Sequence, residues 1–339
     1  MRPLVSIVFA SYGSTHLLAR AIPPVLSART CDVEVLVVNN DPGEDVAADL
    51  GPVAGGSVRI VEMGHNAGYC GAHNRGFAES RGEFVLFANA DLFVSDDYVD
   101  ELVAFMQRRP RAACANGKIF RYDLVEDRPT ELLDTAGLSI GRNRRGTDRG
   151  EGRDADGAYE TEEQVFAANG AAFFARRRAL EDVAVDGEVF DEMFFMYRED
   201  LDLSWRLRLA GWECWYVPTA HAYHARASRG LGSLAYRSSP LAFHRQQRLK
   251  PRLSRTNSMR NQWLMLVKNE DLSNLVRDLP HIAVRELGVV VWALLFSPRT
   301  LVAVPEFARA LPRALGKRRL IKQRQTVPAR AIRDWFGLA

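Results

Sequence analysis

Residues 195–206 read FMYREDLDLSWR and place Glu199, Asp200 and Asp202 directly after an aromatic cluster. Hydrophobic and polar residues alternate from there on, as in a strand, but acids open the stretch, arginines come near its end, and Gly211 follows. Acidic first turns, basic last turns and a terminal glycine are typical of a helix. We therefore predict a helix. Its acids either cap the N-terminus or include a group that does chemistry, because desolvating a charge beside aromatic rings is costly.

The chain upstream of this helix alternates short apolar runs with helical patterns. Such alternation predicts an α/β fold, here a Rossmann-like, mostly parallel sheet flanked by helices. Ligands in these sheets bind beyond the carboxyl ends of the strands, so polar residues that follow the strands are site candidates. The predicted strands are 5–10, 33–39, 58–63 and 84–89, and the predicted helices lie near 16–28, 44–50, 71–80 and 96–108.

The second half of the chain contains a stretch rich in glycine and charge at 141–157. We predict a mobile loop there, because this composition can bury little apolar surface. A helical pattern near 258–269 precedes a basic, amphipathic C-terminal region. The predicted organisation is one large domain at 1–270, with halves 1–118 and 119–270, followed by a helical appendage at 271–339.

The composition is that of a soluble globular protein, with 47% hydrophobic and 26% charged residues and a net charge of +3. The four cysteines form no CxxC pair, which favours free thiols in a reducing cytoplasm over a zinc site or disulfides. No uninterrupted apolar run reaches about 18 residues, so no membrane-spanning helix is predicted. Two segments, 226–260 and 309–333, are basic and contain no acid.

Several short motifs occur in one order along the chain. Together they resemble the inverting family 2 glycosyltransferases of the GT-A fold, in the rhamnosyltransferase-like branch, over roughly residues 3–270. The long FDE motif is the most specific of them. The motifs are VVNND (37–41), NAGYCGAHNRG (66–76), NAD (89–91), NGAAFF (169–174), FDEMFFMYREDLDLSWR (190–206), AGW (210–212), VP (217–218) and HARAS (224–228).

The resemblance implies a nucleoside diphosphate sugar as donor, bound by the 1–118 half. It also implies a divalent metal, Mn²⁺ or Mg²⁺, on the departing diphosphate, with Asp91 and His224 as its ligands. Asn89 stands where the family's DxD motif has its first acid and brings no charge, so weaker metal affinity is expected. Asn39 stands where many relatives carry Asp, and its amide can still donate to and accept from a base, whose identity stays open. The nucleotide-side candidates are Ala10, Tyr12, Asn39, Gly68, Asn74, Asn89 and Asp91.

Asp200 matches the family's general base, which takes the proton from the acceptor hydroxyl. Its aromatic neighbours are expected to raise its pKa by disfavouring the charged form. Asp202 is expected to serve structure. The acceptor-side candidates in the 119–270 half are Glu199, Gly170 and Trp215.

The resemblance favours dTDP-rhamnose as donor, with a UDP-sugar next, and a saccharide or polyprenyl-linked acceptor in cell-envelope polysaccharide synthesis. Residues 281–325 mix apolar faces with arginine and lysine. This pattern fits a peripheral contact with the inner face of the membrane, and equally a helix packed on the protein or across a homodimer. No nucleic-acid module is evident. Two other functions stay open: a sugar nucleotidyltransferase, and a catalytically silent nucleotide- or glycan-binding protein.

Overall fold

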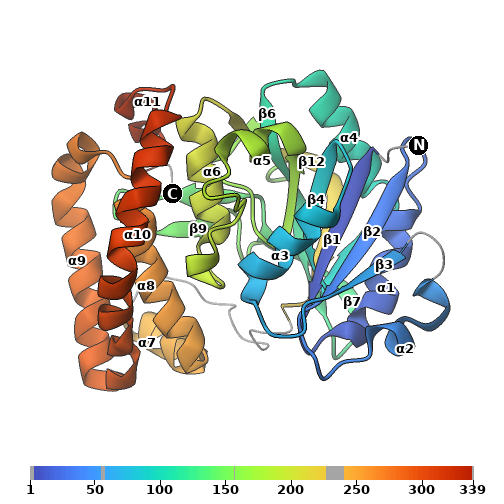
Figure 1. The fold of residues 1–339 in the computed structure, drawn as a ribbon, viewed down its shortest axis with the longest axis horizontal. Coiled ribbons are helices and arrows are strands. Elements are labelled where there is room, and N and C mark those ends of the chain that lie inside the picture. The colour runs from blue at the N-terminus through green and yellow to red at the C-terminus, as the bar shows by residue number, and fades with distance from the viewer. Residues whose placement is uncertain (1–3, 55–57, 156, 227–239, 338–339) are drawn as a thin grey trace.

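The protein is an α/β sheet domain with a layer of helices standing beside it (Figure 1), in a computed structural model that describes residues 4–54, 58–155, 157–226 and 240–337. Residues 227–239 of the basic segment 226–260 therefore lie outside the described residues. The main sheet has the order β10-β12-β6-β11-β4-β1-β2-β3, with β5 paired to β12 and β7 to β6. Its strands are β1 Val5–Ser11, β2 Val33–Asn39, β3 Val58–Glu62, β4 Phe84–Asn89, β5 Leu92–Val94, β6 Ala112–Asp123, β7 Arg128–Thr135, β10 Glu163–Gln164, β11 Ala172–Arg176 and β12 Glu213–His224.

The sheet is mixed: β1 to β4 form a parallel part, as predicted, but β10 and β5 pair antiparallel with β12, and β7 with β6. Strand β1 pairs in parallel with β2 and β4, β2 with β3, and β6 with β12, whereas β11 runs antiparallel between β4 and β6. The β-branched runs identified in the sequence form β1 to β4 within two residues of their predicted bounds. Strands β1, β2 and β4 are largely buried on both faces, which explains their apolar sequences, whereas Arg59 and Glu62 of the edge strand β3 are exposed.

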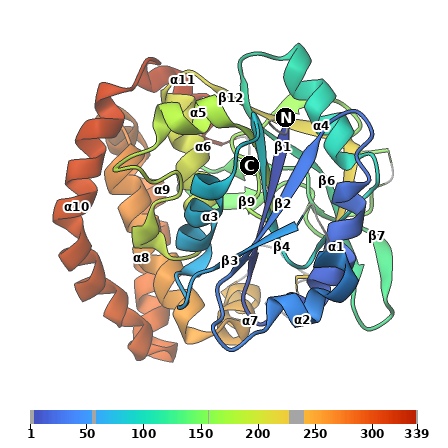
Figure 2. The same cartoon turned by 45° about the vertical axis from the view of Figure 1, so that its right-hand side comes forward.

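Helices cover both faces of the sheet (Figure 2). One core joins the sheet to α1, α2 and α4, and the other joins it to α3, α5, α6 and α8. The helix predicted over the acidic stretch is confirmed as α6, and it is buried on nearly every side. The bounds are α1 Thr15–Leu26, α2 Val46–Leu50, η1 Gly51–Ala54, α3 Gly68–Glu79, α4 Tyr98–Arg108, α5 Arg177–Val183, η2 Glu192–Phe194 and α6 Glu199–Leu209.

The C-terminal helices form the layer at the left of Figure 1, and α8 lies between α6 and α10. This layer begins before residue 271, because α8 packs on α10. Helix α9 is long and apolar enough to cross a membrane by length and composition, although charged side chains interrupt it. No helix of this kind was predicted, because only uninterrupted apolar residues were counted in the sequence. The bounds are α7 Pro240–Leu249, α8 Arg252–Asn269, α9 Leu272–Phe296, η3 Pro298–Val302, α10 Ala303–Gln323 and α11 Ala329–Arg333.

The stretch 141–157, predicted as a loop that buries little, is partly regular and partly buried. It contains strand β9 (Gly146–Asp148), which pairs with β8 (Leu138–Ile140). Arg144 is fully buried and forms ion pairs with Glu270 and Asp278. The prediction was wrong here because acids far along the chain compensate the charge of this arginine, which allows it to be buried.

Candidate active site

Asn89, Asp91 and His224 come together beyond the carboxyl end of β4. Strand β5 pairs antiparallel with the end of β12, with Leu92 opposite His224, so the register itself brings Asp91 to the histidine. The Nε2 atom of His224 lies 3.3 Å from Oδ1 of Asp91 and 3.4 Å from Nδ2 of Asn89. Asn89 and Asp91 were predicted on the nucleotide side, and Asp91 and His224 as metal ligands; the structure brings all three side chains together.

Asp134 fixes the other side of the His224 ring. Its Oδ2 atom lies 2.9 Å from Nδ1 of His224, and Arg226 pairs with the same carboxylate. Burial alone would lower the pKa of His224, but Asp91 and Asp134 outweigh it and raise the pKa to about 9. Burial would raise the pKa of Asp134, yet Arg226 and His224 hold it at about 2. Asp134 thus orients the imidazole so that Nε2 faces Asp91, a role that nothing in the local sequence indicated.

A divalent metal fits this corner as one carboxylate and one imidazole, with Asn89 beside them. Among the described residues no group of three or more histidine, cysteine or acidic side chains could hold a metal ion. Asp91 and His224 could therefore supply only part of a coordination shell, and a bound diphosphate and water would have to complete it. Imidazole suits Mn²⁺ better than Mg²⁺, and the charged His224 must lose its proton to bind either ion.

Asp200 lies at the first turn of α6, facing the turn at Asn169–Ala171. Its Oδ2 atom accepts a hydrogen bond from the N–H of Gly170 at 3.0 Å, and its Oδ1 atom from that of Leu201 at 2.7 Å. Burial raises the pKa of Asp200 above its ordinary value, and Asp148 adds to this, although the two backbone bonds and Arg198 act against it. The direction is the one expected from the sequence, and a raised pKa suits a proton acceptor.

The turn at Asn169–Ala171 connects the two groups. The N–H of Asn89 donates to the carbonyl of Ala171 at 3.1 Å, while the N–H of Gly170 binds Asp200. Tyr69, at the start of α3, donates its hydroxyl to the carbonyl of Gly170 at 2.7 Å. The same part of the sheet edge is therefore bordered by the group of Asn89, Asp91 and His224, by the candidate base, and by the N-terminus of α3.

The segment that leads into α6 has a strained backbone. Phe195, Tyr197 and Arg198 have φ angles of 62°, 73° and 76°, a left-handed conformation that costs a side chain-bearing residue about 1–2 kcal/mol. The Nδ2 atom of Asn261, on α8, lies 2.8, 2.9 and 2.9 Å from the carbonyl oxygens of Phe194, Met196 and Tyr197. Asn261 is fully buried. This contact between Asn261 and the three carbonyls was not predicted from the sequence, which shows only a polar run inside a helical pattern there.

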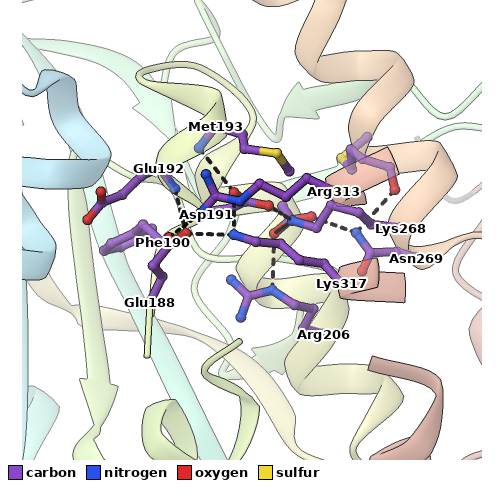
Figure 3. A network of polar contacts seen from close by, with 12 residues as sticks. Glu188, Phe190, Asp191, Glu192, Met193, Arg206, Lys268, Asn269, Arg313 and Lys317 are labelled. Carbon is purple, nitrogen blue, oxygen red and sulfur yellow. Dashed lines mark hydrogen bonds and ion pairs between the residues drawn. The ribbon is translucent and has the colours of Figure 1, made fainter. Parts of the chain in front are cut away.

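Two further acids of the motif, Asp191 and Asp202, serve the packing of the helical layer, and Figure 3 shows the contacts around Asp191. Asp202 accepts from Lys268 at 2.9 Å and from Asn269 at 2.7 Å, in agreement with its expected structural role. Asp191 pairs with Lys268 and, at 2.8 Å, with Lys317 of α10. Burial would raise the pKa of Asp191, but the two lysines hold it well below its usual range.

Glu199 is 7% exposed and lies close enough to Tyr69 and Cys70 to raise the pKa of both groups, in addition to the larger effect of burial. It therefore lies on the α3 side of Asp200. Gly68, at φ 71°, begins α3, and a Cβ atom there would come within 2.4 Å of the carbonyl oxygen of Phe195. The close approach of α3 to the strained segment requires glycine at this position.

The other nucleotide-side candidates follow β1 and β2 or lie on α3. Ala10 is half-buried near the end of β1, and Tyr12, beyond it, is 57% exposed. The amide of Asn39 donates to the carbonyl of Glu44 at 3.1 Å and to Glu62 at 2.8 Å. Asn74 is bonded through both polar atoms to the backbone of Phe190. Its side chain thus holds the FDE segment.

Trp215 is not brought to this group. It lies opposite Ala115 of β6, whereas His224 lies opposite Arg121, six residues further along β6, which corresponds to roughly 20 Å. Its ring packs against Phe105, and its Nε1 atom donates to Glu213 at 3.0 Å. The ring thus lies in the core between the sheet and α4.

The fold is the GT-A fold of glycosyltransferases, and solved structures share it. The structure is similar to that of GalNAc-T7 with UDP, GalNAc and Mn²⁺, with a TM-score of 0.53 and 12% sequence identity over 79% of this chain and 48% of that one. It is also similar to residues 1–349 of S. aureus TarS, with a TM-score of 0.51 and 15% sequence identity over 98% and 90% of the two chains.

The particular family follows from the sequence comparison. The model of glycosyl transferase family 2 matches residues 6–183, slightly more than half of the chain. The chain belongs to glycosyl transferase family 2, and the predicted class of enzyme, a glycosyltransferase, is confirmed.

Curated relatives agree with the family. The chain is 29% identical over 251 residues to the N-acetylglucosaminyl-diphospho-decaprenol L-rhamnosyltransferase of Mycobacterium tuberculosis, covering 67% of this chain and 78% of the relative. It is 48% identical to rhamnosyltransferase WbbL of Escherichia coli over 54 residues, or 16% and 20% of the two chains. It spans a quarter of the length of a Sinorhizobium fredii relative that is 29% identical over 67% of this chain.

Proposed function

We propose that this protein transfers a sugar, with inversion, from a nucleoside diphosphate sugar to a hydroxyl group of a lipid-linked saccharide. The observation that carries the proposal is the turn at Asn169–Ala171, which joins Asp200 to the corner formed by Asp91 and His224. Inversion needs one base on one face of the sugar and a stabilised leaving group on the other. This geometry supports that division of roles.

Asp200 is the proposed general base. Its backbone bonds to Gly170 and Leu201 fix the carboxylate, and its raised pKa makes it a stronger proton acceptor than an exposed carboxylate. It takes the proton from the acceptor hydroxyl as that oxygen attacks the anomeric carbon of the donor. Glu199 and Gly170 border the acceptor side of this carboxylate in the proposal.

Asp91 and His224 are the proposed holders of Mn²⁺ or Mg²⁺, with Asn89 as a neutral neighbour. A bound ion would neutralise the charge that develops on the departing diphosphate. Ala10, Tyr12 and Asn39 lie at the carboxyl ends of β1 and β2, where a base and ribose bind in sheets of this kind.

The donor we propose is dTDP-rhamnose, with a UDP-sugar as the second choice. The rhamnosyltransferases among the relatives support the sugar. The name of the Mycobacterium tuberculosis relative describes a diphospho-decaprenol saccharide, which supports a polyprenyl-linked acceptor in cell-envelope synthesis. The site of action that we propose is the cytoplasmic face of the membrane.

Titration calorimetry with dTDP, UDP and GDP, each with and without Mn²⁺, tests the donor side. We expect metal-dependent binding of dTDP and release of a proton from His224 when the ion binds. Equal binding of all three nucleotides without metal would contradict the assignment of Asp91 and His224.

Turnover with the matching nucleotide sugar tests the base. In Asp200→Asn we expect turnover to fall by about 10²-fold or more while nucleotide affinity is retained. Trp215→Phe, in the core between the sheet and α4, is the control and is expected to keep full turnover. Unchanged turnover in Asp200→Asn would remove Asp200 as base. Nucleotide binding with no transfer by the wild type would favour a silent binding protein.

A further inference from the structure

Helix α9 presents an apolar stripe on its outer side. Six side chains at helical spacing are each exposed by half or more, and we call them the α9 face: Val276, Leu279, Val284, Leu287, Val291 and Leu294. Leu295 and Phe296 extend the stripe at its C-terminal end. A continuous apolar stripe of this length is unusual on a monomeric soluble protein and marks an interaction surface.

The inner side of α9 is fixed to the rest of the molecule by polar contacts. Asp278 is almost fully buried and accepts from Arg144 at 2.9 Å. Trp263 of α8 donates to Glu286 at 2.7 Å. These contacts hold α9 alongside the protein, so that only its outer side is available to a partner.

The charge around the α9 face has one sign. Between His244 and Arg333, in the part of this range that the structure describes, every acidic residue is buried or half-buried, whereas many arginines are exposed. The acids are Glu270, Asp271, Asp278, Glu286 and Glu306, and the exposed arginines include Arg245, Arg248, Arg252, Arg277, Arg299 and Arg309. The helical layer therefore offers apolar side chains beside positive charge.

This combination favours a lipid surface over a second copy of the chain. A symmetric dimer would bring the same patch of both copies together. The arginines would then repel one another, because no acid of helices α7 to α11 is exposed among their described residues, and Asp334, directly after α11, adds a single exposed negative charge. Anionic phospholipid supplies both the apolar phase and the negative charge.

The end of the stripe is linked to the segment before the candidate base through α7 and the start of α8. The end of α9 contacts α7 through the rings of His244 and Phe296, 4.6 Å apart. The start of α8, directly after α7, reaches the segment before Asp200, with the Tyr197 hydroxyl 3.0 Å from that of Ser254. Figure 1 shows the end of α9, the start of α8 and the start of α6 toward the same lower end of the molecule.

We propose that the α9 face lies in the interface of an anionic phospholipid bilayer, with α9 parallel to the surface and the surrounding arginines on the headgroups. The inference deepens the proposed function, because an enzyme held on a bilayer meets a lipid-linked acceptor there. Binding to lipid does not itself depend on transferase activity, so the two can fail separately.

Sedimentation of the full chain with vesicles tests the proposal. We compare vesicles of phosphatidylcholine alone with vesicles that contain phosphatidylglycerol. Each arginine near an anionic surface strengthens binding by roughly fivefold, so we expect binding to be at least about tenfold stronger with phosphatidylglycerol, and to fall at high salt.

The double variant Leu287→Glu, Leu294→Glu places two acids on the α9 face one heptad apart. We expect its vesicle binding to fall by about tenfold or more, because two apolar contacts are lost and two negative charges are added. The matched control is Val125→Glu, which changes a side chain that is 73% exposed in the turn between β6 and β7. Both variants change exposed residues, and circular dichroism and thermal unfolding check that they stay folded.

Three outcomes would overturn the proposal. The wild type does not bind vesicles of either composition, or the double variant binds as well as the control. Alternatively, the wild type is a dimer by light scattering without lipid, and the double variant is a monomer, which would assign the α9 face to a second copy. Transferase assays on a soluble acceptor analogue remain informative in each case, because they do not need the bilayer.

Discussion

The replacement of Asn261 by leucine should lower both the stability of this enzyme and its turnover. The amide of Asn261 is fully buried and lies within 2.9 Å of the carbonyl oxygens of Phe194, Met196 and Tyr197. An amide has two N–H donors. Leucine has a similar size and no donor, so it would leave these carbonyls without the bonds that hold three left-handed residues in place.

The expected loss follows from the number of orphaned groups. The carbonyl of Phe194 keeps a second donor, Arg260, at 3.2 Å, so the two carbonyls of Met196 and Tyr197 carry most of the loss. Each buried acceptor that loses its partner costs about 1–3 kcal/mol. We expect the free energy of unfolding to fall by about 2–4 kcal/mol in urea denaturation, because the segment relaxes in part.

Turnover should fall as well, because Asp200 follows the strained segment directly. A shift of about 1 Å in a catalytic group costs about 10²-fold in rate, so we expect kcat to fall by that order while nucleotide affinity changes little. Gln262→Leu is the matched control. Gln262 is the next residue on α8, is equally buried, and donates to the carbonyl of Arg144 at 3.0 Å. The reasoning is refuted if Asn261→Leu keeps the kcat of the wild type, or if Gln262→Leu lowers kcat equally.

Further predictions concern the lysine network, the pH dependence of stability, Asp91 and Trp215. Lys317→Met leaves Asp191 with one lysine, and thermal unfolding should show a loss of about 3 kcal/mol. The pKa of Asp191 is held below its usual range, so the stability that it contributes is present above about pH 4 and is lost as the pH falls. The free energy of unfolding should therefore decrease between about pH 5 and pH 2, with a smaller slope in Asp191→Asn. Asp91→Asn should weaken nucleotide binding in calorimetry only when Mn²⁺ is present. Trp215→Phe should leave the KM for the donor unchanged, and an increase would contradict its placement in the core.

The sheet and its edge were predictable because their signals are local. Apolar β-branched runs mark β1 to β4, and the rule that ligands bind at the carboxyl ends of parallel strands directed attention to Asn89 and Asp91. The helical character of α6 was readable from the charges at its ends. Antiparallel β11 was not predicted, because strand pairing depends on contacts between distant parts of the chain.

The parts that sequence reasoning missed depend on pairs far apart in the chain. Arg144 is buried only because Glu270 and Asp278 compensate it, more than 100 residues away. Asp134 belongs to the site only because it reaches His224, and Asn261 only because α8 packs against the segment before α6. A charged or polar residue gives no local sign of such a partner.

The ion pairs from Asp191 and Asp202 to Lys268 and Lys317 also bear on how enzymes of this family can be recombined. The acids of the motif that carries the candidate base thus pair with lysines in the last quarter of the chain. A chimaera that exchanges the C-terminal helices for those of a relative must therefore exchange matching acids and lysines together. If only one half is exchanged, buried charges stay unpaired, and the cost falls on the segment next to Asp200. The C-terminal helices and the segment next to Asp200 are thus inherited as one unit.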